Sequence, residues 1–256
     1  MAPVLSACLV INHCGDEVDL ALRCIQNADL EVSVFLSDIS PEELTAERLK
    51  WSFPGVVVLP QEKNTSLTRA YNAVLMQLQS RYHLMMDPGV SFNPSLLRQM
   101  VSYMDAHPNI AILSPRFLSE EGEELFLPRR QISVRYMLGT VFSGFGGIFR
   151  KWYREYTFAD NNVEMPVPVG SAPVTFMMIR ADIFKGLNGF DTRYSRTQED
   201  ADMCRRILDA RLGSVVYHPG MQVVCRSGAE KAALSPGRTH RPGTVLRYFM
   251  KWGITW

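Results

Sequence analysis

The sequence predicts an α/β fold in which a mostly parallel sheet is flanked by helices. Short apolar runs alternate with helical patterns along the first half of the chain. The run at 4–11 is apolar almost throughout, which is typical of a strand buried on both faces. Between residues 67 and 78 the apolar side chains follow helical spacing instead. Sheets of this kind bind ligands at the carboxyl ends of their strands, so functional residues are expected there.

The expected elements follow in a regular order. Strands are predicted at 4–11, 32–36, 56–59, 83–86 and 111–113, and helices at 16–26, 67–78 and 94–107. Pro94 after Asn93 marks the start of the third helix, because proline suits the first helical position. Residues 119–170 are rich in aromatics, glycine and arginine and give no assignment. The pattern returns at Val174, with a helix at 199–212 and strands at 214–217 and 221–225.

Composition narrows the class of function. The chain has 256 residues, 46% of them hydrophobic, and a net charge of +1, so no overall field favours nucleic acid. The five cysteines form no CxxC pair, which favours reduced, buried thiols in a cytoplasmic protein. No stretch reaches the ~18 apolar residues needed to span a bilayer. The run at 4–11 is too short for a secretory signal and has no basic residues before it.

The most informative stretch is 189–206, GFDTRYSRTQEDADMCRR. It places Glu199, Asp200 and Asp202 at the start of a predicted helix. Acidic residues in a first helical turn interact favourably with the helix dipole, so a simple helix start is one interpretation. The other is a catalytic carboxylate that the preceding loop holds over a cleft.

A resemblance supports the second interpretation. The segments FMMIRADIFKGLNGFD and QEDADMCRR resemble the C-terminal half of family-2 inverting glycosyltransferases. That family has an apolar strand, an arginine, a GGFD-type turn and an E-D-x-D-L-C-x-R motif. The resemblance implies a GT-A fold. It also implies that Asp200 is the catalytic base, with Glu199 beside it orienting the loop or contacting the acceptor.

The resemblance extends to the N-terminal half, where it implies a nucleotide-sugar site. The residues concerned are Asn12, Asp38, Asn64, Arg69 and Asn72. Asp38 would accept a hydrogen bond from the base, although a turn-forming Asp-x-Ser is an equal alternative. Asn64 is also a possible helix cap, with Ser66 as its rival. Arg69 and Asn72 are three residues apart and therefore share one helix face.

The metal motif departs from the family pattern. The family has two acids after its fourth strand, which hold a divalent cation on the diphosphate, whereas this chain reads Asp87-Pro88-Gly89. Asp87 alone can serve Mg²⁺ or Mn²⁺, since such ions commonly take one or two carboxylates plus phosphates and waters. Cys225 stands where the family often has histidine, and His240 is the fallback metal ligand. Metal dependence is left open.

Two segments mix basic with apolar and aromatic side chains. They are 129–156 and the tail at 247–256. One interpretation is peripheral contact with an anionic membrane. The alternative, given equal weight, is a core-packing insertion whose arginines extend to the surface. The glycines at 144, 146 and 147 argue against one continuous helix.

The linker around Arg129-Arg130 and the tail around Leu246-Arg247 resemble bacterial O-antigen and polysaccharide rhamnosyltransferases. This implies transfer of a sugar, such as rhamnose, from a dTDP- or UDP-sugar to a growing glycan on an isoprenoid diphosphate. The place would be the cytoplasm, at the inner face of the bacterial cytoplasmic membrane. We expect one domain over 1–256, with a nucleotide-sugar-binding half at 1–118, an irregular insertion at 119–170, and an acceptor and catalytic half at 171–256. The alternative is a catalytically silent relative that binds glycan or lipid.

Overall fold

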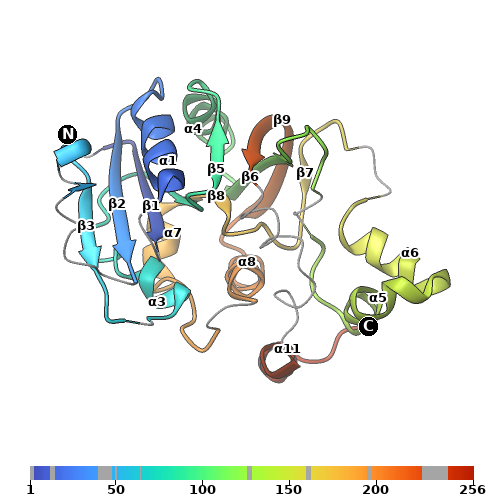
Figure 1. The fold of residues 1–256 in the computed structure, drawn as a ribbon. Coiled ribbons are helices and arrows are strands. Elements are labelled where there is room, and N and C mark those ends of the chain that lie inside the picture. The colour runs from blue at the N-terminus through green and yellow to red at the C-terminus, as the bar shows by residue number, and fades with distance from the viewer. Residues whose placement is uncertain are drawn as a thin grey trace.

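The computed structural model describes residues 3–11, 15–39, 48–49, 51–63, 65–125, 129–159, 163–194, 198–226 and 242–256. A nine-stranded sheet forms the centre of this described part (Figure 1). Its strands are β1 (Leu5–Ile11), β2 (Val32–Asp38), β3 (Val57–Pro60), β4 (Tyr82–Met86), β5 (Val90–Phe92), β6 (Ile110–Leu118), β7 (Val167–Pro168), β8 (Phe176–Arg180) and β9 (Ser214–Cys225).

Strand order mixes the two halves of the chain. Neighbours follow the order β3-β2-β1-β4-β8-β6-β9-β5, and β7 pairs with β9. The first four strands of that order are mutually parallel, as the sequence predicts. β8 runs antiparallel between β4 and β6, so a C-terminal segment lies in the middle of the sheet. The α/β class is therefore confirmed, with antiparallel pairs in the second half.

Helices cover both faces of the sheet. They are α1 (Asp16–Gln26), α3 (Leu67–Asn72), α4 (Leu96–Ala106), α5 (Val134–Phe142), α6 (Gly147–Tyr156), α7 (Ala181–Gly186), α8 (Glu199–Asp209) and α11 (Pro242–Trp252), with a 3₁₀ turn η1 (Ser143–Phe145). α1 and α4 pack in one apolar cluster with the sheet, and α3, α7 and α8 pack in a second. A third cluster, rich in tyrosine, joins α5, α6, α8 and α11 beside the sheet.

Several predicted elements differ in extent, among them the strand expected at 111–113, which spans 110–118 as β6. The helix expected at 67–78 ends as α3 at Asn72, because the next turns are closed by i→i+3 bonds from Leu75 N–H to Asn72 O and from Gln77 N–H to Val74 O. The strands expected at 214–217 and 221–225 form one strand, β9. Its pairing with β6 shifts register between Pro115 and Arg116, where an irregularity absorbs the extra residues.

The unassigned stretch 119–170 contains a helical hairpin, α5–η1–α6. Gly146 and Gly147 adopt positive φ angles of 74° and 53°, which end one helix and begin the next. The glycines therefore interrupt the helix, as expected. The segment escaped assignment because α5 and α6 are short, of nine and ten residues, and the glycine-rich turn between them interrupts the pattern.

The four cysteines in the described residues are free thiols, namely Cys8, Cys24, Cys204 and Cys225. Three of them are buried, and burial raises the pKa of Cys204 to about 12. These three therefore pack as small apolar side chains. Cys14 lies outside the described residues.

Candidate functional site

The carboxyl ends of β1, β2 and β4 meet at one edge of the sheet. Ile11 pairs with Asp38, and Leu9 pairs with Met86, so these parallel strands finish side by side. Asp38 is the last residue of β2 and is buried, while Asp87 follows β4 directly. The edge thus brings together two of the carboxylates that the sequence singles out. Asn12 follows β1 but lies outside the described residues.

Asp87 is held in a tight turn at this edge. Its Oδ1 accepts a hydrogen bond from Gly89 N–H at 2.8 Å, and its own N–H donates to Thr175 O at 2.8 Å. The second bond ties the end of β4 to the residue before β8. The turn therefore fixes the Asp87 carboxylate, which is half-buried, relative to both strands.

Tyr71 connects this edge to the acidic start of α8. Burial raises the pKa of Tyr71 well above its usual range, and the negative charges of Asp87 and Glu199 act in the same direction. Both carboxylates must therefore lie within electrostatic reach of one hydroxyl. The structure thus brings together Asp87, from the end of β4, and Glu199, which is far away in sequence.

The α3 residues have separate tasks. Ser66 caps the helix, with its Oγ accepting from Arg69 N–H at 3.4 Å, so the capping role falls to Ser66. The side chain of Arg69 is exposed. Asn72 forms two hydrogen bonds with the backbone of Phe190, each 2.8 Å long. Its place in the site is therefore structural in this conformation, and a nucleotide contact stays a prediction. Asn64 lies outside the described residues.

The turn that Asn72 holds requires glycine. Gly189 has φ of 70°, and a Cβ placed there would lie 2.2 Å from Asn72 Oδ1. Arg206 of α8 braces the same turn by donating to Leu187 O at 2.9 Å and to Gly189 O at 2.6 Å. The NGF motif therefore joins α3 to the acidic helix.

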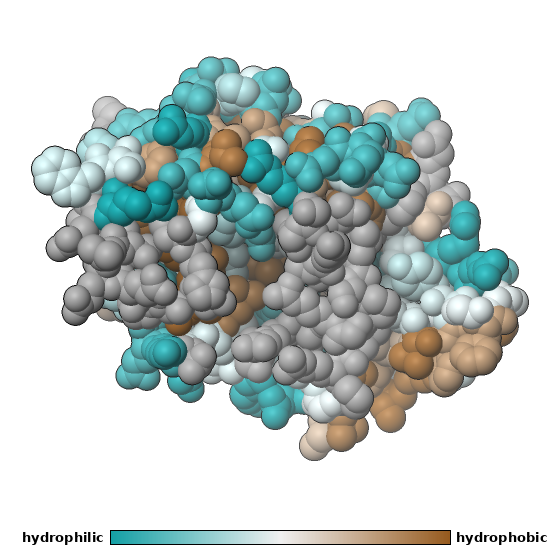
Figure 2. All heavy atoms as spheres, in the orientation of Figure 1, coloured by the Kyte–Doolittle hydropathy of each residue, from teal (hydrophilic) through white to brown (hydrophobic). Residues whose placement is uncertain are grey.

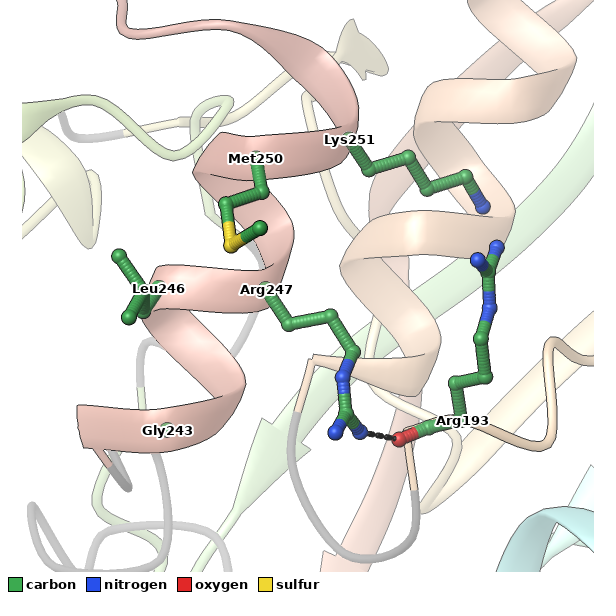
Figure 3. Close-up of a pocket in the computed structure, with 6 residues that line it drawn as sticks. All are labelled: Arg193, Gly243, Leu246, Arg247, Met250 and Lys251. Atoms are coloured by element: carbon green, nitrogen blue, oxygen red, sulfur yellow. Dashed lines mark hydrogen bonds between the residues drawn. The ribbon is translucent and has the colours of Figure 1, made fainter.

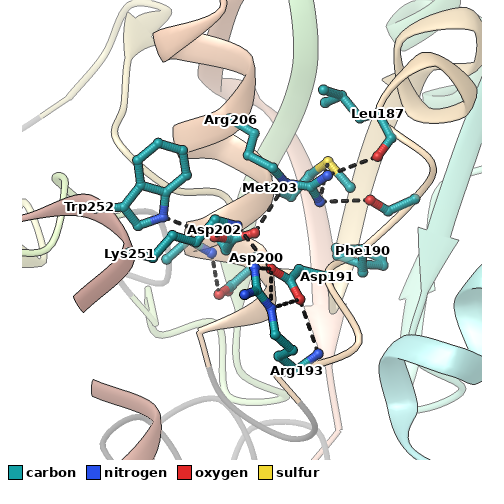
Figure 4. Close-up of polar contacts among 12 residues, drawn as sticks. Leu187, Phe190, Asp191, Arg193, Asp200, Asp202, Met203, Arg206, Lys251 and Trp252 are labelled. Atoms are coloured by element: carbon teal, nitrogen blue, oxygen red, sulfur yellow. Dashed lines mark hydrogen bonds and ion pairs between the residues drawn. The ribbon is translucent and has the colours of Figure 1, made fainter. Parts of the chain in front are cut away.

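Asp202 is the structural member of the acidic triple (Figure 4). It is fully buried and accepts from Lys251 at 2.7 Å, from Trp252 Nε1 at 2.9 Å and from Arg206 at 3.1 Å. Lys251 also pairs with Asp191 at 2.9 Å. The pKa of Asp191 is held well below its usual range, by Arg193 first and by Lys251 as well. This network attaches α11 to α8.

Asp200 has a different environment. It is half-buried in the first turn of α8, and its Oδ1 accepts from Ala201 N–H at 2.7 Å. Burial raises the pKa of Asp200, and the positive charge of Arg129 opposes that shift. A carboxylate with a raised pKa is a stronger base than an exposed one. The start of α8 is itself irregular, since Gln198 adopts a left-handed φ of 70°.

Arg129 is a site residue that sequence reasoning did not assign. Its guanidinium lies over the Tyr156 ring at 5.6 Å and within electrostatic reach of Asp200. Its carbonyl accepts from both Gly170 and Ser171 N–H at 2.8 Å, so its backbone is fixed. The sequence signal was the Arg129-Arg130 pair, which lies in a segment that we interpreted, with equal weight, as a membrane-facing or a core-packing segment.

The residues present fit a cation that is held largely by a ligand's own phosphates. Among the residues that the structure describes, no group of three or more His, Cys, Asp or Glu side chains converges on one point. Asp87, however, supplies a fixed carboxylate at the edge, which is the single protein ligand that Mg²⁺ or Mn²⁺ commonly requires beside a diphosphate. Cys225 is buried in β9, opposite Val90 of β5, and His240 lies outside the described residues.

A separate groove of about 540 Å³ follows the exposed side of α11 (Figure 3). Its lining residues are Arg193, Gly243, Leu246, Arg247, Met250 and Lys251. Arg247 donates to the carbonyl oxygen of Arg193, which joins α11 to the turn after Asp191 (Figure 3). Asp87 and Asp200 do not line this groove, so it is distinct from the sheet edge.

Relatives with assigned names match most of the chain. One is an N-acetylglucosaminyl-diphospho-decaprenol L-rhamnosyltransferase of Mycobacterium tuberculosis, 23% identical over 88% of this chain and 76% of its own length. Another is the amylovoran biosynthesis glycosyltransferase AmsE of Erwinia amylovora, 26% identical over 60% of this chain and 65% of its own length.

Solved structures share the fold. A mannosyltransferase of Pyrobaculum calidifontis, in complex with GDP-Man and Mn²⁺, superposes with a TM-score of 0.58 at 12% identity, over 88% of this chain. GalNAc-T7 with UDP, GalNAc and Mn²⁺ superposes with a TM-score of 0.63 at 12% identity, also over 88% of this chain. The chain spans 57% and 44% of the lengths of these two proteins. The match confirms the predicted GT-A-like fold.

The family itself is shown by sequence. Residues 18–187 match the profile of glycosyl transferase family 2, which is more than half of the chain. The matched range includes Asp38 and Asp87 and ends before α8, so it leaves the role of Asp200 as a prediction. The protein belongs to glycosyl transferase family 2.

Proposed function

We propose that the protein transfers a sugar, with rhamnose as the first candidate, from a dTDP- or UDP-sugar to a lipid-linked glycan such as an O-antigen precursor, with inversion at the anomeric carbon. The supporting observation is that Asp87, from the donor-side edge, and Glu199, from α8, both lie within electrostatic reach of the buried Tyr71 and raise its pKa after burial itself. A donor at that edge would place its sugar next to the first turn of α8, where Asp200 lies. The named function of the mycobacterial relative supports a lipid-linked acceptor.

The donor would bind along the edge of β1, β2 and β4. Asp38 is assigned to the base and Arg69 to the phosphates, while Asn12 and Asn64 keep their predicted contacts. Asp87 would hold Mg²⁺ or Mn²⁺ together with the diphosphate oxygens. When bound, such an ion offsets the negative charge that develops on the leaving diphosphate.

Asp200 acts as the general base. A carboxylate oxygen of Asp200 takes the proton of the acceptor hydroxyl, whose oxygen then bonds to the anomeric carbon on the face opposite the nucleoside diphosphate. The bond to the diphosphate oxygen breaks, and the configuration inverts. Burial raises the pKa of Asp200, which strengthens the base, and the positive charge of Arg129 opposes that shift. Glu199 orients the loop or contacts the acceptor. A lipid-linked acceptor would place this step at the inner face of the cytoplasmic membrane.

The first experiment is calorimetric titration of the wild type with dTDP and with UDP, each with and without Mn²⁺. Asp87→Asn is the test variant, because its amide oxygen still accepts from Gly89 N–H while the charge is lost. Exposed Asp29→Asn is the matched control. We expect Mn²⁺-dependent binding that Asp87→Asn weakens and Asp29→Asn does not. Absence of binding to either nucleotide would contradict the donor site.

The second experiment tests the base. Asp200→Asn should lower turnover by about 10²–10⁴-fold without lowering the unfolding temperature, because a general base contributes about that much. Asp209→Asn, exposed at the other end of the same helix, is the control. Full activity in Asp200→Asn would contradict this role.

A catalytically silent relative is the second candidate. Gly89 in place of the family's second acid, and Cys225 in place of its histidine, favour it. Nucleotide binding without turnover, in the presence of lipid-linked acceptor, would select this candidate.

A further inference from the structure

The α5–η1–α6 hairpin has a buried base and an exposed tip. At the base, Tyr136 and Tyr156 are buried and stack with ring centroids 5.3 Å apart. Gly139 lets the two helices approach closely, since a Cβ there would lie 2.8 Å from Tyr153 N. The base therefore belongs to the tyrosine-rich cluster beside α8. This half of the segment fits the interpretation of a core-packing insertion.

The tip exposes large apolar side chains. Phe145 is 83% exposed, Val141 62% and Ile148 55%. Figure 2 shows a brown, hydrophobic area on the side of the molecule where Figure 1 places α5 and α6. Exposed apolar patches of this kind mark surfaces that contact a partner or a membrane.

The last residues of the chain extend the same surface. Thr255 O accepts from Val134 N–H at 2.9 Å, and the rings of Trp152 and Trp256 lie 6.2 Å apart. Trp256 is 74% exposed and Ile254 80% exposed. The tip (residues 141–148) and the end (residues 254–256) are therefore anchored to the same pair of helices, and we call them together the apolar tip surface.

The charges around this surface have one sign. Arg150, Lys151 and Arg154 are exposed on α6, and Glu155, which is half-buried, is the only acidic residue between 134 and 156. Cations beside exposed aromatic side chains suit the boundary of an anionic bilayer, where the rings enter the headgroup region and the cations contact phosphates. The same cations disfavour pairing of two copies through this face, since they would meet across a two-fold interface.

We propose that the apolar tip surface docks the protein on a bilayer that contains anionic lipid. Among the described residues no helix combines the length and apolar character that crossing a bilayer requires. The proposed contact is peripheral, with the tip inserted to headgroup depth and the sheet held away from the membrane. This binding does not depend on the proposed sugar transfer, and vesicles without any acceptor test it.

The experiment is flotation of the full chain with vesicles of phosphatidylcholine, alone or with phosphatidylglycerol. The test variant is Phe145→Glu with Ile148→Glu. The matched control is Trp51→Glu with Met76→Glu, because these residues are 89% and 95% exposed on other parts of the surface. We expect the wild type and the control to float with anionic vesicles. The tip variant should bind these vesicles at least about tenfold more weakly than the wild type.

A second variant tests the charges. Arg150→Gln with Lys151→Gln should weaken binding by about fivefold for each cation removed, and salt should weaken wild-type binding in the same way. Failure of the wild type to float, or equal flotation of wild type and tip variant, would overturn the proposal. So would self-association that the tip variant abolishes while vesicle binding is absent. Nucleotide titration of the same variants separates this result from the proposed transfer, since their donor binding should equal that of the wild type.

Discussion

Two regions of the molecule are held together by different forces. The first, which we call the sheet body, consists of β1–β9 with α1, α3, α4 and α7. Its centre is apolar, with Leu9, Leu84 and Met178 completely buried. The second, the helical flank, consists of α5, α6, α8 and α11. Its centre holds the buried Asp202 with Lys251 and Arg206, surrounded by tyrosines and Trp252.

The difference bears on where the proposed chemistry would take place. Apolar packing has no directional demands beyond shape, so it gives the sheet a rigid edge on which Asp38 and Asp87 are fixed. Buried charges contribute little net stability but are costly when one partner is missing. The flank is therefore sensitive to single charge changes, and it is also the region in which the proposed base, Asp200, is tuned by charge.

The largest expected effect comes from Asp202→Asn. Removing this charge leaves Lys251 and Arg206 without their shared partner and should lower the free energy of unfolding by about 3–5 kcal/mol. Urea unfolding followed by tryptophan emission reports it, since Trp152, Trp252 and Trp256 lie in or beside the flank. Asp209→Asn is the exposed control on the same helix. Equal stability of the two variants would mean that the regions do not differ in this way.

Asn72→Ala tests the contact between the two regions, in which α3 of the sheet body bonds the turn that precedes α8. The substitution removes two hydrogen bonds to the backbone of buried Phe190, so we expect a loss of about 2–4 kcal/mol in unfolding free energy. Gln77→Ala, exposed after the same helix, is the control. Weaker dTDP binding at unchanged stability would instead assign Asn72 to the nucleotide, as the sequence predicts.

His83 tests the sheet body by pH. Its ring is completely buried, with Nδ1 2.8 Å from Ser6 Oγ, and burial lowers its pKa to about 3. The unfolded chain binds a proton near pH 6.5 that the folded chain does not bind until about pH 3. Because of His83, the free energy of unfolding should therefore decrease by about 1.4 kcal/mol for each pH unit as pH falls from 6.5 towards 3.

His83→Asn should remove that slope, because asparagine can still bond Ser6 and does not titrate in this range. Thermal unfolding between pH 4 and 7 measures it, with exposed His107→Asn as the control for loss of a histidine. A slope that persists in His83→Asn would show that other groups dominate acid unfolding.

The smallest effect expected is that of Arg129→Gln. Arg129 lowers the pKa of Asp200 against the effect of burial, so its removal raises that pKa further. The proposed base must be ionised to accept a proton, so the acidic limb of the kcat/KM profile should move to higher pH. Arg130→Gln, whose guanidinium lies over Phe158 instead, should leave the limb in place. Equal pH profiles for Arg129→Gln and the wild type would show that Arg129 does not influence the proposed base.

The sequence was sufficient for the parallel strands β1–β4, because local pattern and burial agree there, whereas the short strands β5 and β7 and the antiparallel position of β8 were not predicted. Continuous apolar runs predict buried parallel strands, and the polar residues that end them, Asp38 and Asp87, necessarily meet at one edge. The start of α8 was also found, through its acidic residues. For Asp200 the neighbour that tunes it, Arg129, lies in a segment without periodicity, so no local rule could connect the two.

The contact between Asn72 and Phe190 could not be predicted for a related reason. Asn72 and Phe190 are 118 residues apart, and an asparagine within a helical pattern suggested a ligand contact rather than a backbone clamp. Asp202 was grouped with its acidic neighbours because its partner Lys251 comes from the tail. Long-range polar pairs of this kind depend on the assembled fold and leave no period in the sequence.

The attachment of α11 through Lys251 has a consequence for biosynthesis. A ribosome releases this helix after every group that it contacts, including Asp191 and Asp202. Before residue 251 has been synthesised, Asp202 lacks one of its two cationic partners, Lys251. Asp202 lies two positions from the proposed base, Asp200. The helix that carries the proposed base therefore completes its contacts only after residue 251 has been synthesised.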